Sequence, residues 1–331
     1  MTEQRVKVAA VQFEGVPGRV ADNLERLRPW VARAVQEGAE VIALPEFFAS
    51  PLPFKQVVHD SVMRADNPAV AFLRDTARRH GVTIGGSMLI VEGDSIYNRY
   101  HLVEPDGRIH LHDKDLPTMW EGAFYGPGAD DGVFDTALGG VGTAVCWELI
   151  RTGTAQRMLG RVGLVMSGTH WWTVPDNWGG LTARALARLA AQNRRMSDQA
   201  PSQFALHLGV PVVQASHCGQ FDTDFMLVPG WRKTLPYRTE FVGATQIVDA
   251  GGQVLARRDT REGPGLVMAS VALGQRAPAQ PLPNRFWLPP LPPLMRAYWH
   301  QQNACAKRYY EREGRARGLA AASAPRLSKG I

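Results

Sequence analysis

The stretch Gly139–Leu149 reads Gly-Gly-Val-Gly-Thr-Ala-Val-Cys-Trp-Glu-Leu, and it predicts how the rest of the chain is organised. Thr143–Val145 is a short apolar run behind a glycine cluster, which is typical of a buried central strand. The segment Glu148–Leu159, followed by Gly160, has the length and apolar spacing of a helix. Cys146 is therefore predicted where a strand passes into a helix, whose amides should lower the pKa of the thiol. The alternative is a small buried apolar residue, and the local sequence favours neither.

On both sides of this stretch, apolar strands alternate with segments of helical periodicity. Strands are predicted at Val6–Phe13, Glu40–Leu44, Val82–Val91, Tyr97–Glu104, Arg108–His112, Val162–Ser167, Val210–Ala215, Thr245–Asp249, Gln253–Arg257 and Gly265–Leu273. Helices are predicted at Asn23–Gln36, Asn67–Arg79 and Leu181–Leu208. Pro29 should start or kink the first helix, and Pro201 should break the last. This order predicts an α/β layered domain with a mixed sheet.

The C-terminal part of the chain has a different character. No linker is visible before residue 277, so residues 1–277 are predicted to form one domain and residues 278–331 a separate segment. Pro278–Pro293 contains seven prolines in sixteen residues, which predicts an extended path over the surface. One further helix is predicted at Met295–Tyr310, followed by a loose end.

Composition places the chain among ordinary soluble globular proteins, with 331 residues, 45% apolar and 21% charged. No run approaches the ~20 apolar residues of a membrane span, and Met1–Val6 is too polar for a secretory signal, so no membrane partner is expected. Three cysteines without a Cys-x-x-Cys pair support neither a disulfide framework nor a zinc site. They fit a reducing cytoplasm.

The net charge of +6 is concentrated near the C-terminus. Lys307–Lys329 contains seven basic residues against Glu311 and Glu313, a net +5, so the remainder of the chain is nearly neutral. Nucleic acid is therefore not an expected partner. The basic part is interpreted as a solvated tail, with an interaction arm as the alternative.

Three ionisable residues besides Cys146 follow predicted strands, where α/β sheets place reactive groups. Glu46 follows Val-Ile-Ala-Leu-Pro, Lys114 follows Arg108–His112, and Glu121 comes seven residues later. A thiol that attacks a carbonyl or nitrile carbon needs a base and a positive group near the developing oxyanion. Singly, each residue could be a cap, a solvated charge or a turn residue. Together they favour a catalytic site.

The ordered set Leu44-Pro45-Glu46, Lys114 and Val145-Cys146-Trp147-Glu148 resembles the nitrilase superfamily of carbon–nitrogen hydrolases. The resemblance covers about Val6 to about Leu273. It implies an αββα four-layer sandwich with mixed β-sheets that forms a homodimer or a higher homo-oligomer. It also implies a thioester or thioimidate intermediate, with Cys146 as nucleophile, Glu46 as base and Lys114 stabilising the oxyanion. Glu121 matches a second glutamate that positions the substrate or the lysine.

The resemblance leaves the substrate open. Lys114-x-x-Pro117-Thr118-x-x-Glu121 and Cys146-Trp147-Glu148 look like the true nitrilases, although Asp113 replaces the arginine usual there. Phe124–Gly128 looks more like amidases and carbamoylases. The expected substrate is a small amide, carbamoyl compound or nitrile, converted to a carboxylic acid and ammonia. Acyl transfer on the same fold and a non-catalytic scaffold are the alternatives.

Aromatic side chains surround the predicted strand ends, which suggests a flat apolar substrate portion. The predicted substrate-binding residues are Phe47, Tyr125, Trp147, His170, Trp171 and Trp172. The equally weighted alternative is packing under loops or at a subunit interface. His110 and His112 alternate on one strand without a third ligand at suitable spacing, so no metal is predicted and no cofactor is expected.

Overall fold

The computed structural model describes residues 4–180, 183–228 and 233–324. Over these residues the apolar runs form strands that join into one hydrogen-bonded sheet with two halves. The first half has the order β14-β1-β2-β3-β4-β5, and the second has the order β13-β12-β9-β8-β7-β6. They connect where Gln12 and Phe13 at the end of β1 pair with Ser216 and His217 of β9.

The strands of the first half are β14 (Gly265–Ala272), β1 (Arg5–Phe13), β2 (Val41–Ala43), β3 (Thr83–Glu92), β4 (Ser95–Val103) and β5 (Ile109–Asp113). Those of the second are β13 (Val254–Arg258), β12 (Thr245–Val248), β9 (Val212–His217), β8 (Leu164–Thr169), β7 (Gly139–Thr143) and β6 (Val133–Thr136). A separate ribbon pairs β10 (Gln220–Met226) with β11 (Thr234–Glu240). Parallel and antiparallel pairs occur in each half, so the mixed sheet is confirmed.

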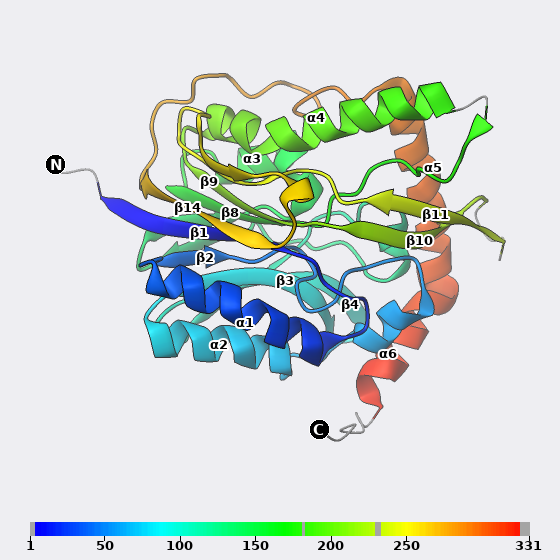
Figure 1. The fold of residues 1–331 in the computed structure, drawn as a ribbon, viewed down its shortest axis with the longest axis horizontal. Helices are drawn as coiled ribbons and strands as arrows, with labels where there is room; N and C mark the ends of the chain where they lie inside the picture. The colour runs from blue at the N-terminus through cyan, green and yellow to red at the C-terminus, as the bar shows by residue number, and fades with distance from the viewer. Residues whose placement is uncertain (1–3, 181–182, 229–232, 325–331) are drawn as a thin grey trace.

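Helices cover the two outer faces and complete a helix–sheet–sheet–helix sandwich (Figure 1). The helices α1 (Val20–Gln36) and α2 (Pro68–His80) pack on the first half, and α3 (Thr152–Met158) and α4 (Ala183–Leu208) lie over the second. Side chains along β1 alternate between the two faces of the sheet, and this alternation shows how the layers form. Its Ala9 and Val11 enter the core beneath α1 and α2, while Val8 and Ala10 face the core between the sheets. The predicted four-layer αββα sandwich is confirmed.

Two helices continue through the prolines that were expected to interrupt them. Helix α1 contains Pro29, which is exposed, so the carbonyl that loses its partner can face water. Helix α4 is unbroken at Pro201, and the prediction of a break was wrong. Its buried face continues past the proline through Phe204 and Leu208, which pack towards β9, and burial outweighs the missing hydrogen bond.

The segment after Cys146 is not the single helix predicted from its sequence. Cys146–Ile150 forms a short 3₁₀-helix, η3, and α3 begins only at Thr152. Between them Arg151 is extended and forms a β-bridge with Trp287 of the proline-rich segment. A distant partner therefore divides the helix, and no signal near Cys146 could have shown it.

The C-terminal segment packs onto the sandwich and is helical as far as Ser323, so the prediction of a loose end was wrong for the described residues. Helix α5 (Pro293–Tyr309), a π-helical turn η6 (Tyr310–Gly314) and α6 (Arg315–Ser323) follow one another. Gly318 is buried, and a Cβ there would meet Ile96 of β4 at 2.4 Å. The proline-rich segment lies extended as predicted, although Trp287 and Leu288 are buried.

The part of the basic tail beyond residue 324 lies outside the described residues. The domain boundary at residue 277 stays a prediction. Within the described ranges, no helix has both the length and the apolar character needed to cross a bilayer.

Candidate active site

Segments that follow strands in both halves of the sheet carry the ionisable residues and bring them together in the interior. Glu46 follows β2, Lys114 directly follows β5, and Cys146 begins η3 after β7. Glu121 lies in the 3₁₀-helix η2 (Met119–Ala123). All four side chains are at most 1% exposed. The four residues predicted as catalytic from separate parts of the sequence therefore share one buried site.

Lys114 lies between two carboxylates. Its Nζ atom is 2.8 Å from Glu46 Oε1 and 2.8 Å from Glu121 Oε2. Burial alone would lower the pKa of the lysine, but Glu121 and Glu46 outweigh this effect and raise it well above its usual value. Lys114 is thus a fixed positive charge, held in place from both sides and fully buried, where bulk solvent screens it little.

Glu46 is held by donors on several elements. Asn98 Nδ2 donates to Oε1 at 2.8 Å, the His170 backbone N–H donates to Oε2 at 2.9 Å, and His217 Nε2 donates to the Glu46 carbonyl at 2.7 Å. Burial raises the pKa of Glu46 to about 7, with Lys114 lowering it and Glu121 raising it. A carboxyl group with a pKa near neutrality can both accept and return a proton.

Glu121 is fixed by its own contacts. The Tyr125 hydroxyl donates to Glu121 Oε2 at 2.5 Å and the Thr118 backbone N–H donates to the same oxygen at 3.0 Å. Its other oxygen, Oε1, is buried and has no partner among the described residues. This arrangement keeps Glu121 beside Lys114 and leaves one carboxylate oxygen available to a bound molecule.

The Cys146 thiol is buried beside these groups, and its pKa differs from the sequence-based prediction. Burial and the Glu46 carboxylate raise the pKa of Cys146 well above its usual value, and Lys114 only partly counteracts them. The prediction of a lowered pKa was wrong because η3 is one short turn and because burial depends on the whole fold. The resting residue is a thiol, and its attack requires a base.

Backbone strain is concentrated at the site. Phe47, Met119 and Cys146 are the described non-glycine residues with positive φ, at 54°, 57° and 56°. Cys146 belongs to the ionisable cluster, and Phe47 and Met119 lie within two residues of Glu46 and Glu121. Such conformations cost about 1–3 kcal/mol each and are kept where the surrounding structure requires them. The surrounding packing therefore fixes how Cys146 is presented.

A second buried cluster joins the lysine loop to the cysteine turn. The His112 ring donates to Asp130 Oδ1 at 2.5 Å and to Glu148 Oε2 at 2.9 Å. Burial lowers the pKa of His112, but Glu148 and Asp130 outweigh it and raise the pKa to about 10. Glu148 also accepts from the backbone N–H groups of Val145 and Asp115. The charged His112 thus connects the residues beside Lys114 with those beside Cys146.

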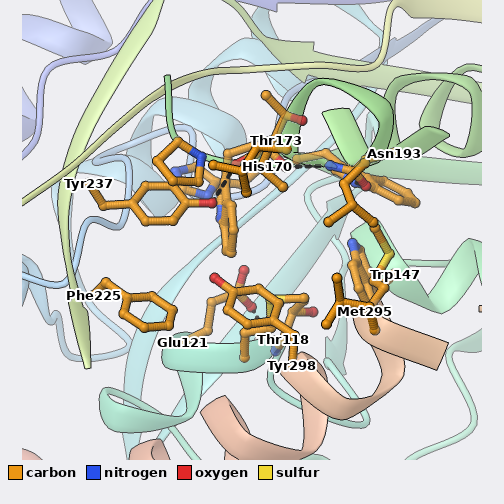
Figure 2. A pocket seen from close by; sticks show the side chains of 18 of the residues that line it. Thr118, Glu121, Trp147, His170, Thr173, Asn193, Phe225, Tyr237, Met295 and Tyr298 are labelled. Carbon is orange, nitrogen blue, oxygen red and sulfur yellow. Dashed lines mark hydrogen bonds between the residues drawn. The ribbon is translucent and has the colours of Figure 1, made fainter. Parts of the chain in front are cut away.

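A cavity of about 210 Å³ opens beside the thiol and the Glu121 carboxylate (Figure 2). Four of the predicted substrate-binding residues line it, namely Trp147, His170, Trp171 and Trp172. Phe47 and Tyr125 are not among the lining residues. Their rings contact each other with centroids 6.1 Å apart, and Tyr125 supports Glu121 as described above. Their direct contact with a substrate stays a prediction.

Most of the remaining cavity wall could not be predicted from local sequence. It comes from α4, the β10–β11 ribbon and α5, and it includes Leu186, Leu189, Phe225, Tyr237, Met295 and Tyr298. Asn98, which holds Glu46, was also missed. Its neighbours in β4 include Arg99 and His101, so no local signal singles out Asn98. No cluster of His, Cys, Asp and Glu suited to a metal occurs among the described residues.

Comparison with known proteins gives a consistent result. A family model described as carbon-nitrogen hydrolase matches residues 7–280. The aliphatic nitrilase of Rhodococcus rhodochrous is 29% identical over 169 residues, which are 46% of this chain and 46% of that protein. Omega-amidase NIT2 of Danio rerio is 31% identical over 192 residues, which are 53% of this chain and 67% of that protein. The chain thus spans about half to two thirds of the length of these relatives.

Solved structures share the architecture. XC1258 from Xanthomonas campestris, a CN-hydrolase superfamily protein, superposes with a TM-score of 0.60 at 19% identity, covering 81% of this chain and 91% of that chain. A mutant of the amidase from Nesterenkonia sp. AN1, with acrylamide added at its active-site cysteine, gives a TM-score of 0.58 at 21% identity. It covers 85% of this chain and 96% of that chain. At these identities the similarity supports the fold.

Proposed function

This chain belongs to the carbon–nitrogen hydrolase family, and from this premise we propose that it hydrolyses a small carboxamide or nitrile through a covalent intermediate on Cys146. The observation that carries the proposal is the buried assembly of Cys146, Glu46 and Lys114 beside an open cavity. The mutant of the Nesterenkonia amidase that carries acrylamide on its active-site cysteine supports the choice of a cysteine nucleophile.

The first half-reaction begins with the neutral thiol. Glu46 takes the Cys146 proton as Sγ bonds to the amide carbon, and the carbonyl oxygen becomes an oxyanion near Lys114 Nζ. The C–N bond then breaks, the proton on Glu46 goes to the leaving nitrogen, and ammonia departs. The product is a thioester on Cys146. A pKa near 7 suits Glu46 to both transfers.

Hydrolysis of the thioester repeats these roles with water in place of the thiol. Glu46 takes a proton from water, the water oxygen bonds to the acyl carbon, and a second oxyanion forms beside Lys114. The C–S bond breaks, the thiol recovers its proton and the carboxylic acid leaves. A nitrile follows the same course after attack gives a thioimidate, which gains water and loses ammonia to reach the same thioester.

The test is intact-mass analysis during turnover of a panel of amides and nitriles, with ammonia measured in parallel. We expect an acyl adduct that maps to Cys146 and ammonia release that Cys146→Ser abolishes. Cys218→Ser is the matched control, because Cys218 is also a buried free cysteine but lies outside the cluster. Turnover retained in Cys146→Ser, or an adduct on Cys218, would refute the assignment. Subunit association stays a separate prediction, tested by sedimentation.

A further inference from the structure

The cavity beside Cys146 has walls that are almost wholly apolar and aromatic. Trp147, Trp171, Trp172 and Trp178 contribute to it from the segments after β7 and β8. The β10–β11 ribbon and α5 supply further rings, as Figure 2 shows for Phe225, Tyr237 and Tyr298. Flat apolar walls on several sides favour a flat apolar ligand.

Two polar side chains in these walls, Asn193 and Tyr237, form hydrogen bonds within the protein. Asn193 Oδ1 accepts from Trp171 Nε1 at 3.0 Å, and its Nδ2 donates to the Trp172 carbonyl at 2.9 Å. The Tyr237 hydroxyl donates to the Thr173 carbonyl at 2.6 Å. Asn193 and Tyr237 therefore present mainly their apolar surface to a ligand. They fix the tryptophans and the β8 loop that form the wall. Nearer the thiol, Thr118 Oγ1, Glu121 Oε1 and His170 Nδ1 have no partner among the described residues and can serve the amide or nitrile group.

The charge of the cavity excludes an anionic ligand portion. Among the described residues that line it, Glu121 carries the formal charge, and Lys114 already pairs with it. Burial lowers the pKa of His170 well below its usual value, so this ring is neutral. A carboxylate on the far part of a substrate would lose its hydration and find no cation.

The size of the cavity suits a ligand with one ring. An apolar cavity of ~150 Å³ in another protein is large enough to bind benzene. The 210 Å³ here holds such a ring together with the reacting carbon and nitrogen. Met295 of α5, which is buried, and Leu189 of α4 both line this cavity and so bound the space for a larger ligand.

We propose that the substrate is an uncharged carboxamide or nitrile with a single aromatic ring, and that Leu189 of α4 and Met295 of α5 set its size and charge. This inference rests on the proposed function and specifies its substrate class. The catalytic residues act on the amide or nitrile group, whereas these two side chains contact the ring. Ring selectivity and bond cleavage are therefore separable in an experiment.

The test measures kcat/KM for benzamide and for analogues with a para carboxylate, a para ammonium group, a second fused ring or a linear alkyl chain. We expect benzamide to exceed the carboxylate analogue by on the order of 10²-fold, because the anion would be buried unpaired. Leu189→Arg should improve the carboxylate analogue relative to benzamide by about tenfold or more, because it introduces a charge-assisted partner. Leu189→Gln, polar but uncharged, is the matched control and should not.

Met295→Ala should favour the fused-ring analogue, because it removes a buried side chain from the wall. Equal turnover of charged, linear and aromatic amides, or a preference for the ammonium analogue, would overturn the inference while Cys146 adducts still upheld the proposed function. Absence of any Cys146 adduct with the whole panel, in folded protein, would refute the proposed function itself. If Leu189→Arg and Leu189→Gln changed the preference for the neutral ring equally, the proposed role of Leu189 would be rejected.

Discussion

Replacing Glu121 by Gln should move the acid limb of the pH–rate profile to lower pH. The profile of kcat/KM reports the ionisation of the free enzyme, and Glu46 must be ionised to accept the thiol proton. In the wild type we expect activity to rise with pH through about 7, the pKa of Glu46. Glu121 contributes to that value because its charge opposes the ionisation of Glu46.

The size of the shift follows from the geometry around Lys114. Glu46 and Glu121 each place an oxygen 2.8 Å from Nζ, so these oxygens are at most twice that distance apart. Two charges ~5 Å apart interact by about 3 kcal/mol at an effective dielectric constant of about 20, which equals about 2 pH units. The direction of the shift is downward, because removing the Glu121 charge favours ionisation of Glu46. The plateau should also fall, because Lys114 loses one of its two anchors.

The assay is kcat/KM for one neutral substrate at closely spaced pH values, together with the rate of Cys146 alkylation if turnover is too slow. Tyr125→Phe is the matched control. It removes a hydrogen bond to the same carboxylate oxygen but leaves the charge, so its acid limb should move far less. An acid limb in Glu121→Gln that stays in place or moves to higher pH would refute the electrostatic account of Glu46.

Three further predictions concern other parts of the site. The pKa of His112 is raised from 6.5 to about 10 on folding, so its stabilising contribution is complete below pH 6.5 and is lost as pH rises through 10. Urea unfolding at several pH values should show this decline in the wild type and not in His112→Asn; parallel curves would contradict it. Lys114→Gln should slow iodoacetamide alkylation of Cys146, because the lysine lowers the pKa of the thiol. Unchanged alkylation rates at every pH would show that the charge of Lys114 does not act on Cys146. Gly314→Ala should reduce kcat, because the new Cβ would lie 2.1 Å from the Ala123 carbonyl oxygen, and Ala123 belongs to η2, the turn that carries Glu121. Gly153→Ala is the control and should leave kcat unchanged, because the nearest atom to its Cβ is 3.9 Å away. Equal kcat in the two glycine variants would disprove that coupling.

The sequence correctly predicted elements whose ends are fixed by residues close to them in the chain. Helix α2 was placed to within one residue because Asn67 accepts hydrogen bonds from the backbone N–H groups of Ala69 and Val70, and because Gly81 ends the helix at a φ of 65°. Glu46, Lys114 and Cys146 were found because each follows a predicted strand, and because their order resembles that of a known family. Their meeting depends on how the two halves of the sheet pack against each other, which the sequence did not show.

What could not be predicted depends on residues far apart in the sequence. The pKa of Cys146 is set by burial under the whole fold and by Glu46, one hundred positions earlier, so the local turn predicted the wrong direction. Trp287, which is more than one hundred positions away in the sequence, pairs with Arg151 and so divides the helix predicted after Cys146. The strand β6 was also missed, because Val133–Thr136 is short and mostly only partly buried.

The position of α5 in the sequence has a consequence for synthesis. Cys146, Lys114, Glu46 and the strands before them leave the ribosome early, but Tyr298 follows Cys146 by about 150 residues. At ~10 residues per second, the last wall of the cavity is translated roughly 15 s after the nucleophile. A nascent chain can thus carry every reacting group before the surface that selects among ligands exists. Discrimination between molecules is completed only when the helix docks.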